Sequence, residues 1–253
     1  MHILLTNDDG IHAPGIQVLY QALKDIAEVT VVAPEYEQSA IGHAITIYNP
    51  LRVSNITNPY NGFKGYAVNG TPADCVKLGV GVILDDKPDM VVSGINLGMN
   101  AGDCLLYSGT VSAATEAVIL QIPSFAISLA TYGTADFGYA ALFARQLAEK
   151  IRDNGLPKGT FLNVNVPALS PDQIKGVAIT RQGRFTFRDK YEQIQDSFGR
   201  TYYWLRNEIV QLTESGNFDL QALKEHKVSI TPVKYDLTDY EYMHELEKWQ
   251  ISV

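Results

Sequence analysis

Two adjacent carboxylates, Asp8 and Asp9, follow a short apolar run at positions 2–6 and precede Gly10. The run is too brief for a helix and is bounded by turn-forming residues, so we predict a buried strand that delivers both acids to a loop. In an open α/β sheet, ligands bind at the carboxyl ends of the strands. Adjacent acids repel each other unless a cation, a basic group or solvent offsets them, so the pair indicates either a site for a hard cation or a solvated turn.

Two later segments bring polar oxygen atoms to the same predicted sheet edge. Ser39 follows the strand predicted over 28–33, and Asn96 follows the strand predicted over 89–94. Together with the two acids, these side chains could supply an incomplete shell of oxygen donors for Mg²⁺ or Mn²⁺, with water filling the rest. Such open positions suit hydrolysis, because an ion there can bind a phosphoryl oxygen and a water together.

A third motif, Ser108-Gly109-Thr110, precedes a run of small residues that we predict to be helical over 111–117. Glycine lets the backbone come close to a ligand, and the free N–H groups of a helix start, with the two hydroxyls, could form a seat for phosphate. The alternative is that the hydroxyls only cap the helix.

Composition excludes several classes of protein. The 253 residues include 28 acidic and 20 basic ones, and the net charge of −8 argues against non-specific binding to nucleic-acid polymers or anionic membranes. Cys75 and Cys104 lack the spacing of a thiolate metal site or a disulfide framework. The sequence shows neither the basic start of a signal peptide nor a membrane-spanning apolar run, so we expect a cytoplasmic protein.

The pattern of elements predicts an α/β fold in a single domain, 1–253. From 1 to 130, strand-like runs alternate with helical stretches, which predicts βαβ units and a mainly parallel sheet flanked by helices. Positions 161–166 alternate polar and apolar residues like a half-exposed strand. The aromatic-rich stretch 181–206 is predicted to be an excursion or hairpin outside the sheet, either a subunit contact or the core of a small subdomain. Positions 228–253 supply a returning strand and a terminal helix.

Several blocks occur in order along nearly the whole chain and together carry a resemblance. They are 4–10 with Asn-Asp-Asp-Gly, 33–34 followed by 38–39, 68–74, 93–98, 107–111 with 113–114, and 228–232. In these blocks the chain resembles the SurE (survival protein E) phosphatases, also called 5′/3′-nucleotidases. The resemblance implies a Rossmann-like fold and a metal-dependent phosphomonoesterase that releases phosphate from nucleoside 5′- and 3′-monophosphates, and from short polyphosphate as well. It also implies a homodimer or homotetramer assembled through a C-terminal extension, which suits 181–206.

The site residues that the resemblance implies are the same ones that the motifs single out. One divalent ion, Mg²⁺ or Mn²⁺, would be bound by Asp8, Asp9, Ser39 and Asn96. The phosphate would lie against Ser108, Gly109 and Thr110. Asp8 or Asp9 would orient or deprotonate the water that attacks phosphorus in line.

The chain departs from the family pattern at two positions. Ala40 stands where the family usually has glycine, and Leu97 stands where a polar residue is common. Neither change removes an expected ligand, but both are expected to affect loop shape and substrate preference. His43, in the same loop, could shuttle a proton or simply hydrogen-bond, and we leave it off the catalytic residues.

Two rival functions share parts of this pattern. A signalling receiver module also binds Mg²⁺ through an acidic pair, but it needs an aspartate at the end of a later central strand, where this chain offers Ser93 and Asn96. A nucleotide-binding protein without turnover would bind its ligand and release no phosphate.

Overall fold

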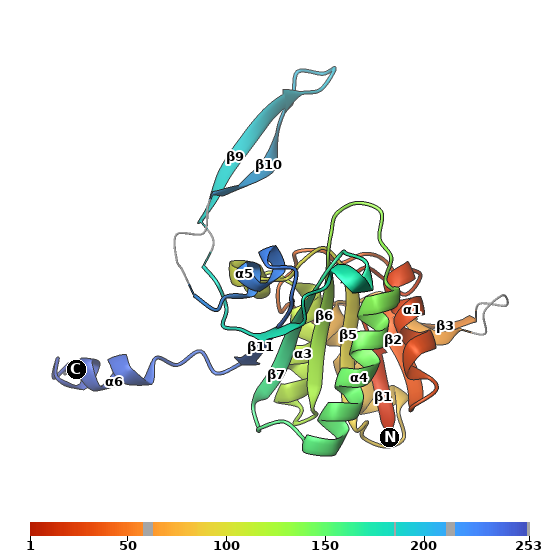
Figure 1. Ribbon diagram of the computed structural model, residues 1–253. Helices are drawn as coiled ribbons and strands as arrows, with labels where there is room; N and C mark the ends of the chain where they lie inside the picture. Colours follow the sequence, from red (N-terminus) through yellow and green to blue (C-terminus); the bar gives the residue numbers. More distant parts are fainter. Residues whose placement is uncertain (58–62, 185, 211–215, 252–253) are drawn as a thin grey trace.

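A large twisted sheet forms the centre of the molecule, and helices cover both of its faces (Figure 1). The structure is a computed structural model and describes residues 1–57, 63–184, 186–210 and 216–251. Residues 58–62, whose Asn-Pro-Tyr-Asn-Gly sequence predicts a turn between two strands, lie outside the described residues. The strands of the large sheet in chain order are β1 (His2–Thr6), β2 (Glu28–Pro34), β3 (Val53–Thr57), β4 (Lys64–Val68), β5 (Met90–Leu97), β6 (Ser124–Ala130), β7 (Thr160–Pro167), β8 (Val177–Ile179) and β11 (Val228–Lys234).

The helices mostly connect these strands in the manner of βαβ units, and the last helix follows the final strand. They are α1 (Pro14–Leu23), α2 (Pro72–Leu78), α3 (Gly109–Ile119), α4 (Gly138–Asn154), α5 (Asp219–Lys224) and α6 (Tyr240–Glu247). Short turns of other helix types are η1 (Gly79–Ile83), η2 (Gly102–Leu106) and η3 (Pro171–Gln173). In the described chain no helix is both long and apolar enough to span a bilayer.

The strand order explains why β1 lies at the heart of the site. Within the described residues the order is β3-β4-β2-β1-β5-β6-β7-β11-β8, and β1 pairs in parallel with both β2 and β5. The chain leaves β1 toward β2 and later returns to its other side as β5, so the order reverses at this point. Ligands of open α/β sheets bind at such a switch point, outside the carboxyl ends of the strands. The predicted mainly parallel α/β fold is confirmed.

The alternation of side chains along β1 builds two apolar layers. Ile3 and Leu5 are fully buried on the face covered by α1 and α4, whereas Leu4 is fully buried on the face covered by α2 and α3. Each fully buried aliphatic side chain stabilises the fold by roughly 1.5–3 kcal/mol relative to exposure. The strand is therefore held rigidly from both sides, and the loop that follows it starts from a fixed position.

The interpretation of 161–166 as a half-exposed strand is wrong. Asn163 and Asn165 on β7 are fully buried. Both side-chain amides donate to the backbone carbonyl oxygen of Asn100, at 2.7 and 3.0 Å, and the side-chain Oδ1 of Asn165 accepts from the Asn100 N–H at 2.8 Å. Because partners inside the protein replace water here, the polar face of the alternation lies in the interior.

The strand predicted to end at 94 continues further. β5 runs to Leu97, so Asn96 is the last residue but one of the strand and does not lie in the loop. A register shift between Gly94 and Asn96 is followed by renewed pairing of Asn96 with Ser128 on β6. The hydroxyl of Thr71, the proline at 72 and the acid at 74 predict a helix that runs to about Leu84. The structure confirms its extent, but the helix changes at Gly79 to the wider η1 turn.

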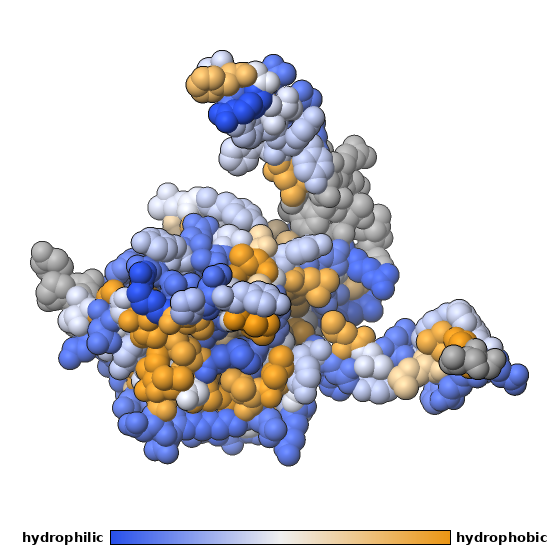
Figure 2. Space-filling model, turned by 180° about the vertical axis from the view of Figure 1, so that it is seen from behind, coloured by the Kyte–Doolittle hydropathy of each residue, from blue (hydrophilic) through white to orange (hydrophobic). Residues whose placement is uncertain are grey.

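Two segments stand away from the body (Figures 1 and 2). The strands β9 (Thr186–Gln195) and β10 (Thr201–Val210) pair only with each other, in an antiparallel hairpin that confirms the predicted excursion outside the sheet. The chain after β11 then leaves the body and carries α6 at its end. Tyr203 is 63% exposed and Trp204 60% exposed on the hairpin.

Candidate active site

The loop after β1 is fixed by its own backbone contacts and by the loop after β2. The Asn7 side-chain amide donates to the Gly10 carbonyl oxygen at 2.9 Å, which closes the turn. Gly10 has φ +96°, a conformation that disfavours other residues, and an added Cβ would lie 3.3 Å from the backbone of Tyr36. The Gln38 N–H donates to the Asp8 carbonyl oxygen at 2.8 Å. The two loops therefore form one unit, with Ser39 directly after the contact.

Asp8 lies against the start of α3. Its side chain is buried, with the residue only 4% exposed, and it accepts a short hydrogen bond from the Thr110 hydroxyl. A Cβ added to Gly109 would lie 2.7 Å from the Cβ of Asp8, so only glycine fits at the first residue of this helix. Burial raises the pKa of Asp8 above its ordinary value, against hydrogen bonds from Thr110 that lower it.

Asp9 reaches across the switch point to the end of β5. Its carboxylate accepts from the Leu97 N–H at 3.1 Å. Burial and the neighbouring charge of Asp8 raise the pKa of Asp9 to about 6. The side-chain amide of Asn96 donates to the Gly98 carbonyl oxygen at 2.7 Å, so its nitrogen is occupied and its oxygen remains available as a ligand.

Ser39 differs from the other predicted ligands, because its hydroxyl donates to another acid. The hydroxyl is 2.6 Å from the Glu37 carboxylate. The next residue, Ala40, has φ +56°, the left-handed conformation in which glycine is favoured. The departure noted at Ala40 therefore falls at a position whose backbone suits the family's usual glycine.

Charge and donor chemistry together test whether a divalent ion fits. In the part of the chain that the structure describes, no Lys, Arg or His forms a salt bridge with Asp8, Asp9 or Glu37. The described residues also contain no group of three or more His, Cys, Asp or Glu that could hold a metal, so hydroxyl and amide oxygens would have to complete any shell. The Oδ1 atom of Asn7 is buried beneath the acids without a hydrogen-bond partner. An acidic pair that no described basic group pairs with fits a hard divalent cation, which prefers oxygen ligands.

The phosphate-seat motif is arranged as a helix start. Ser108 is the N-cap of α3, and its hydroxyl oxygen accepts from the Val111 N–H at 3.1 Å, so the capping role is present. The helix N-terminus carries partial positive charge and free N–H groups, which attract anions. Because Gly109 touches Asp8, this end of α3 directly adjoins the acidic pair.

A second polar cluster lies two turns along α3 and was not singled out from the sequence. Glu116 is 3% exposed and pairs with His43 at 2.8 Å and with Lys77 of α2 at 3.0 Å. Burial acts to raise the pKa of Glu116, but the hydrogen bonds from His43 and Lys77 outweigh it and lower the pKa. A signal for Glu116 exists in the sequence, since it is the one charged residue in the small-residue run 111–117.

Comparisons with known proteins match the whole chain to one family. The family model described as "Survival protein SurE" matches residues 3–189. A relative named 5′-nucleotidase SurE from Natranaerobius thermophilus is 48% identical over 258 residues, covering 100% of both chains. Another of the same name, from Moorella thermoacetica, is 51% identical and covers 97% of this chain and 95% of its own.

A solved structure agrees with the sequence relatives. The crystal structure of the SurE protein from Aquifex aeolicus superposes with a TM-score of 0.86 at 39% identity, covering 99% of this chain and 100% of the other. The resemblance to the SurE family is thereby confirmed. This chain belongs to the SurE family.

Proposed function

We propose that this protein is a metal-dependent 5′-nucleotidase, a phosphomonoesterase that hydrolyses nucleoside monophosphates to nucleoside and phosphate. Relatives aligned over essentially the whole chain carry the name 5′-nucleotidase. The observation that carries the proposal is the contact of Asp8 with Gly109 and Thr110, which joins an acidic pair to the anion-attracting end of α3. A phosphate ester needs both features, since its charge must be neutralised and its oxygens must be held.

The residues proposed to hold one divalent ion, Mg²⁺ or Mn²⁺, are Asp8, Asp9, Ser39 and Asn96. Metal dependence is expected of a SurE-family member, and the donor set supports it, because two carboxylates without basic partners are joined by a hydroxyl and an amide oxygen. When bound, such an ion stabilises charge on the phosphoryl group and raises the hydroxide fraction of water at neutral pH.

The protein's own groups are proposed to bind and orient the reactants. Gly109 lets Asp8 approach the α3 N-terminus closely, and the N–H groups of this helix start, with Ser108 and Thr110, are proposed to bind a phosphate oxygen. The Thr110 hydroxyl fixes the Asp8 carboxylate, and the Leu97 N–H fixes that of Asp9. One of the two carboxylates orients or deprotonates the water that attacks phosphorus in line.

Phosphate release from adenosine and guanosine monophosphates tests this assignment. We expect release with Mg²⁺ or Mn²⁺, its loss with a chelator, and a fall of about 10²- to 10⁴-fold in the Asp8→Asn variant. Near-normal activity of that variant would contradict the proposed role of Asp8. The same panel, extended to 3′-monophosphates and short polyphosphate, determines whether these finer substrate assignments hold.

The receiver-module rival predicts a different product. Brief incubation with a small phosphodonor would leave a stable acyl phosphate on such a module, whereas a nucleotidase leaves only free phosphate. The carboxyl end of β5 carries Ser93 and Asn96 in the place of the required aspartate. A purely nucleotide-binding protein would bind nucleoside monophosphate and give no metal-dependent release.

The assembly and location are also proposals. We infer that the chain is one domain over 1–253 that forms a homodimer or homotetramer through its hairpin and C-terminal extension. The support is that Tyr203 and Trp204 are exposed on a hairpin that pairs with none of the described strands of the body, and such aromatic residues favour interfaces. Light scattering on the intact protein and on a Trp204→Ser variant tests this. We infer a cytoplasmic location, in keeping with two cysteines that are free in the structure.

A further inference from the structure

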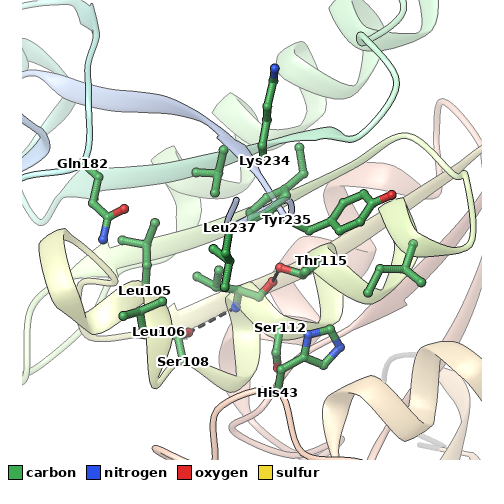
Figure 3. Close-up of a pocket in the computed structure, with 14 residues that line it drawn as sticks. His43, Leu105, Leu106, Ser108, Ser112, Thr115, Gln182, Lys234, Tyr235 and Leu237 are labelled. Atoms are coloured by element: carbon green, nitrogen blue, oxygen red, sulfur yellow. Dashed lines mark hydrogen bonds between the residues drawn. The ribbon is translucent and has the colours of Figure 1, made fainter. Parts of the chain in front are cut away.

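A cavity of about 250 Å³ runs along one side of α3, starting at the N-cap residue of the proposed phosphate seat (Figure 3). Ser108 stands at this start, and Ser112 and Thr115 continue along the same side of the helix. The next residue of the helix start, Gly109, touches Asp8. A molecule whose phosphate lies at the helix N-terminus therefore has space for its remaining part in the cavity.

The walls combine apolar surface with a few polar atoms. Leu105, Val111 and Phe161 supply apolar surface, which suits the faces of a planar ring. The hydroxyls of Ser112 and Thr115 donate to carbonyl oxygens of their own helix, at 2.8 and 2.9 Å. Their donor function is thus used, and their oxygens remain as acceptors toward the cavity.

His43 enters the cavity from the loop that carries Ser39, and Glu116 fixes its orientation. The two side chains meet at 2.8 Å through Nε2 of the imidazole. A carboxylate is only an acceptor, so Nε2 carries the proton and Nδ1 is left for another partner. The His43 side chain is 32% exposed, whereas the Glu116 side chain is 5% exposed. The buried acid therefore aims a partly open imidazole.

The loop around His43 is fixed on both sides. Before it, the Gly42 N–H donates to the Tyr107 carbonyl oxygen at 2.9 Å. After it, the backbone N–H and the hydroxyl of Thr46 donate to Asp74 at 2.9 and 2.6 Å. An imidazole held in this way loses little freedom when it binds a ligand.

We propose that this cavity is the subsite for the nucleoside part of the substrate and that Nδ1 of His43 binds a ribose hydroxyl. The inference rests on the proposed nucleotidase function and adds the part of the site that recognises more than phosphate. Ribose hydroxyls both donate and accept, so they match Nδ1 of His43 and the hydroxyl oxygens of α3, and the apolar walls receive the base.

The test compares a nucleotide with an ester that has no ribose. For each variant, kcat/KM is measured for adenosine 5′-monophosphate and for p-nitrophenyl phosphate, and their ratio gives the selectivity for the nucleoside. We expect His43→Ala to lower this ratio about 3- to 10-fold, the effect of one lost hydrogen bond, mainly through KM. Thr115→Leu, which fills the cavity, is expected to lower the ratio as well.

Lys77→Met is the matched control. Lys77 binds the same carboxylate at 3.0 Å, but it lies on α2 and does not line the cavity. We expect its selectivity ratio to equal that of the wild type. Glu116→Gln keeps a hydrogen-bonding group beside His43. This variant should therefore keep most of the selectivity ratio that His43→Ala loses. An unchanged ratio in His43→Ala, or an equal fall in Lys77→Met, would overturn the proposal.

Direct binding separates this inference from the proposed function. Adenosine is titrated into wild-type and His43→Ala protein and followed by calorimetry, with thermal unfolding as the check on folding. Weaker adenosine binding by the variant supports the subsite even if no phosphate is released, in which case only the proposed function fails. Equal binding by both proteins, or no adenosine binding by the wild type, overturns the subsite whether or not phosphate is released.

Discussion

Two buried acids lie at different points along α3, one against its first turn and one on the helix itself. The two acids differ in their partners. At the first turn of α3, Asp8 is 4% exposed and meets a second acid, Asp9. Two turns later, Glu116 is 3% exposed and meets His43 and Lys77. The pKa of Asp8 is raised, whereas the pKa of Glu116 is lowered.

The difference shows how burial alone fails to identify a functional acid. Burial opposes ionisation at both places, but only at Glu116 do nearby basic groups compensate the charge. At Asp8 and Asp9 the described partners are hydrogen-bond donors and other acids, so negative charge remains to be balanced from outside. An acid that lacks an internal counter-charge indicates a ligand site, and an acid that has one indicates a positioning role.

Loss of enzymatic activity should distinguish the acidic pair from Glu116 most strongly. We expect Asp9→Asn to lower kcat for adenosine monophosphate by about 10²-fold or more, because it removes a proposed ligand and water-orienting group. We expect Glu116→Gln to change kcat less than about threefold, since a hydrogen bond to His43 can still form. Steady-state kinetics with saturating Mn²⁺ measures both. Equal losses in the two variants would break the distinction.

Cation binding should give the next largest difference between the acidic pair and Glu116. An ion that binds only the folded protein stabilises it by about 2.7 kcal/mol when its concentration is 100 times Kd. Thermal unfolding with increasing Mn²⁺ should therefore show a rising midpoint for the wild type and for Glu116→Gln, and little change for Asp9→Asn. A full Mn²⁺ response in Asp9→Asn would show that the ion binds elsewhere.

Sequence patterns predicted the fold and the delivery of Asp8 and Asp9 to the carboxyl edge of the sheet because both follow from local rules. Period-two and period-3.6 patterns specify strands and helices, and parallel strands place their carboxyl ends at one edge. Gly109 was readable for the same reason, since a glycine at a helix start permits close approach.

The sequence did not reveal contacts that depend on which distant side chains meet. The sequence around Glu116 does not show which residues it meets, and only the packing of α2 and the loop after β2 brings Lys77 and His43 to it. Asn163 and Asn165 looked exposed because their partner, Asn100, is more than 60 residues away. Polar residues that are satisfied by long-range partners carry no local signal of burial.

The stability contribution of Glu116 should depend on pH with a defined sign. Its folded pKa lies below the ordinary value of 4.5, so its pairing with His43 and Lys77 stabilises the protein above pH 4.5 and is lost as the pH falls through the lowered value. We expect Glu116→Gln to reduce the unfolding free energy by about 1–2 kcal/mol at pH 7, a modest effect because both partners are partly exposed. Urea unfolding of both proteins at several pH values should show this difference shrinking below pH 4.5, and a difference that grows on acidification would contradict the assigned sign.

The smallest effect concerns the loop segment between Ser39 and His43, which links the surroundings of Asp8 to those of Glu116. Ala40 has φ +56°, and a left-handed residue with a side chain costs about 1–2 kcal/mol, whereas the added freedom of glycine in the unfolded chain costs about 0.5–1 kcal/mol. Ala40→Gly should therefore raise the unfolding free energy by roughly 0.5–1 kcal/mol. Ala44→Gly, four residues on and without a positive φ, should lower it by the entropy cost alone. Urea unfolding compares the two. Destabilisation by both substitutions would mean that the backbone at Ala40 is unstrained. The loop would then be free to shift. In that case side-chain contacts, and not a fixed loop, would keep the Asp8 and Glu116 environments apart.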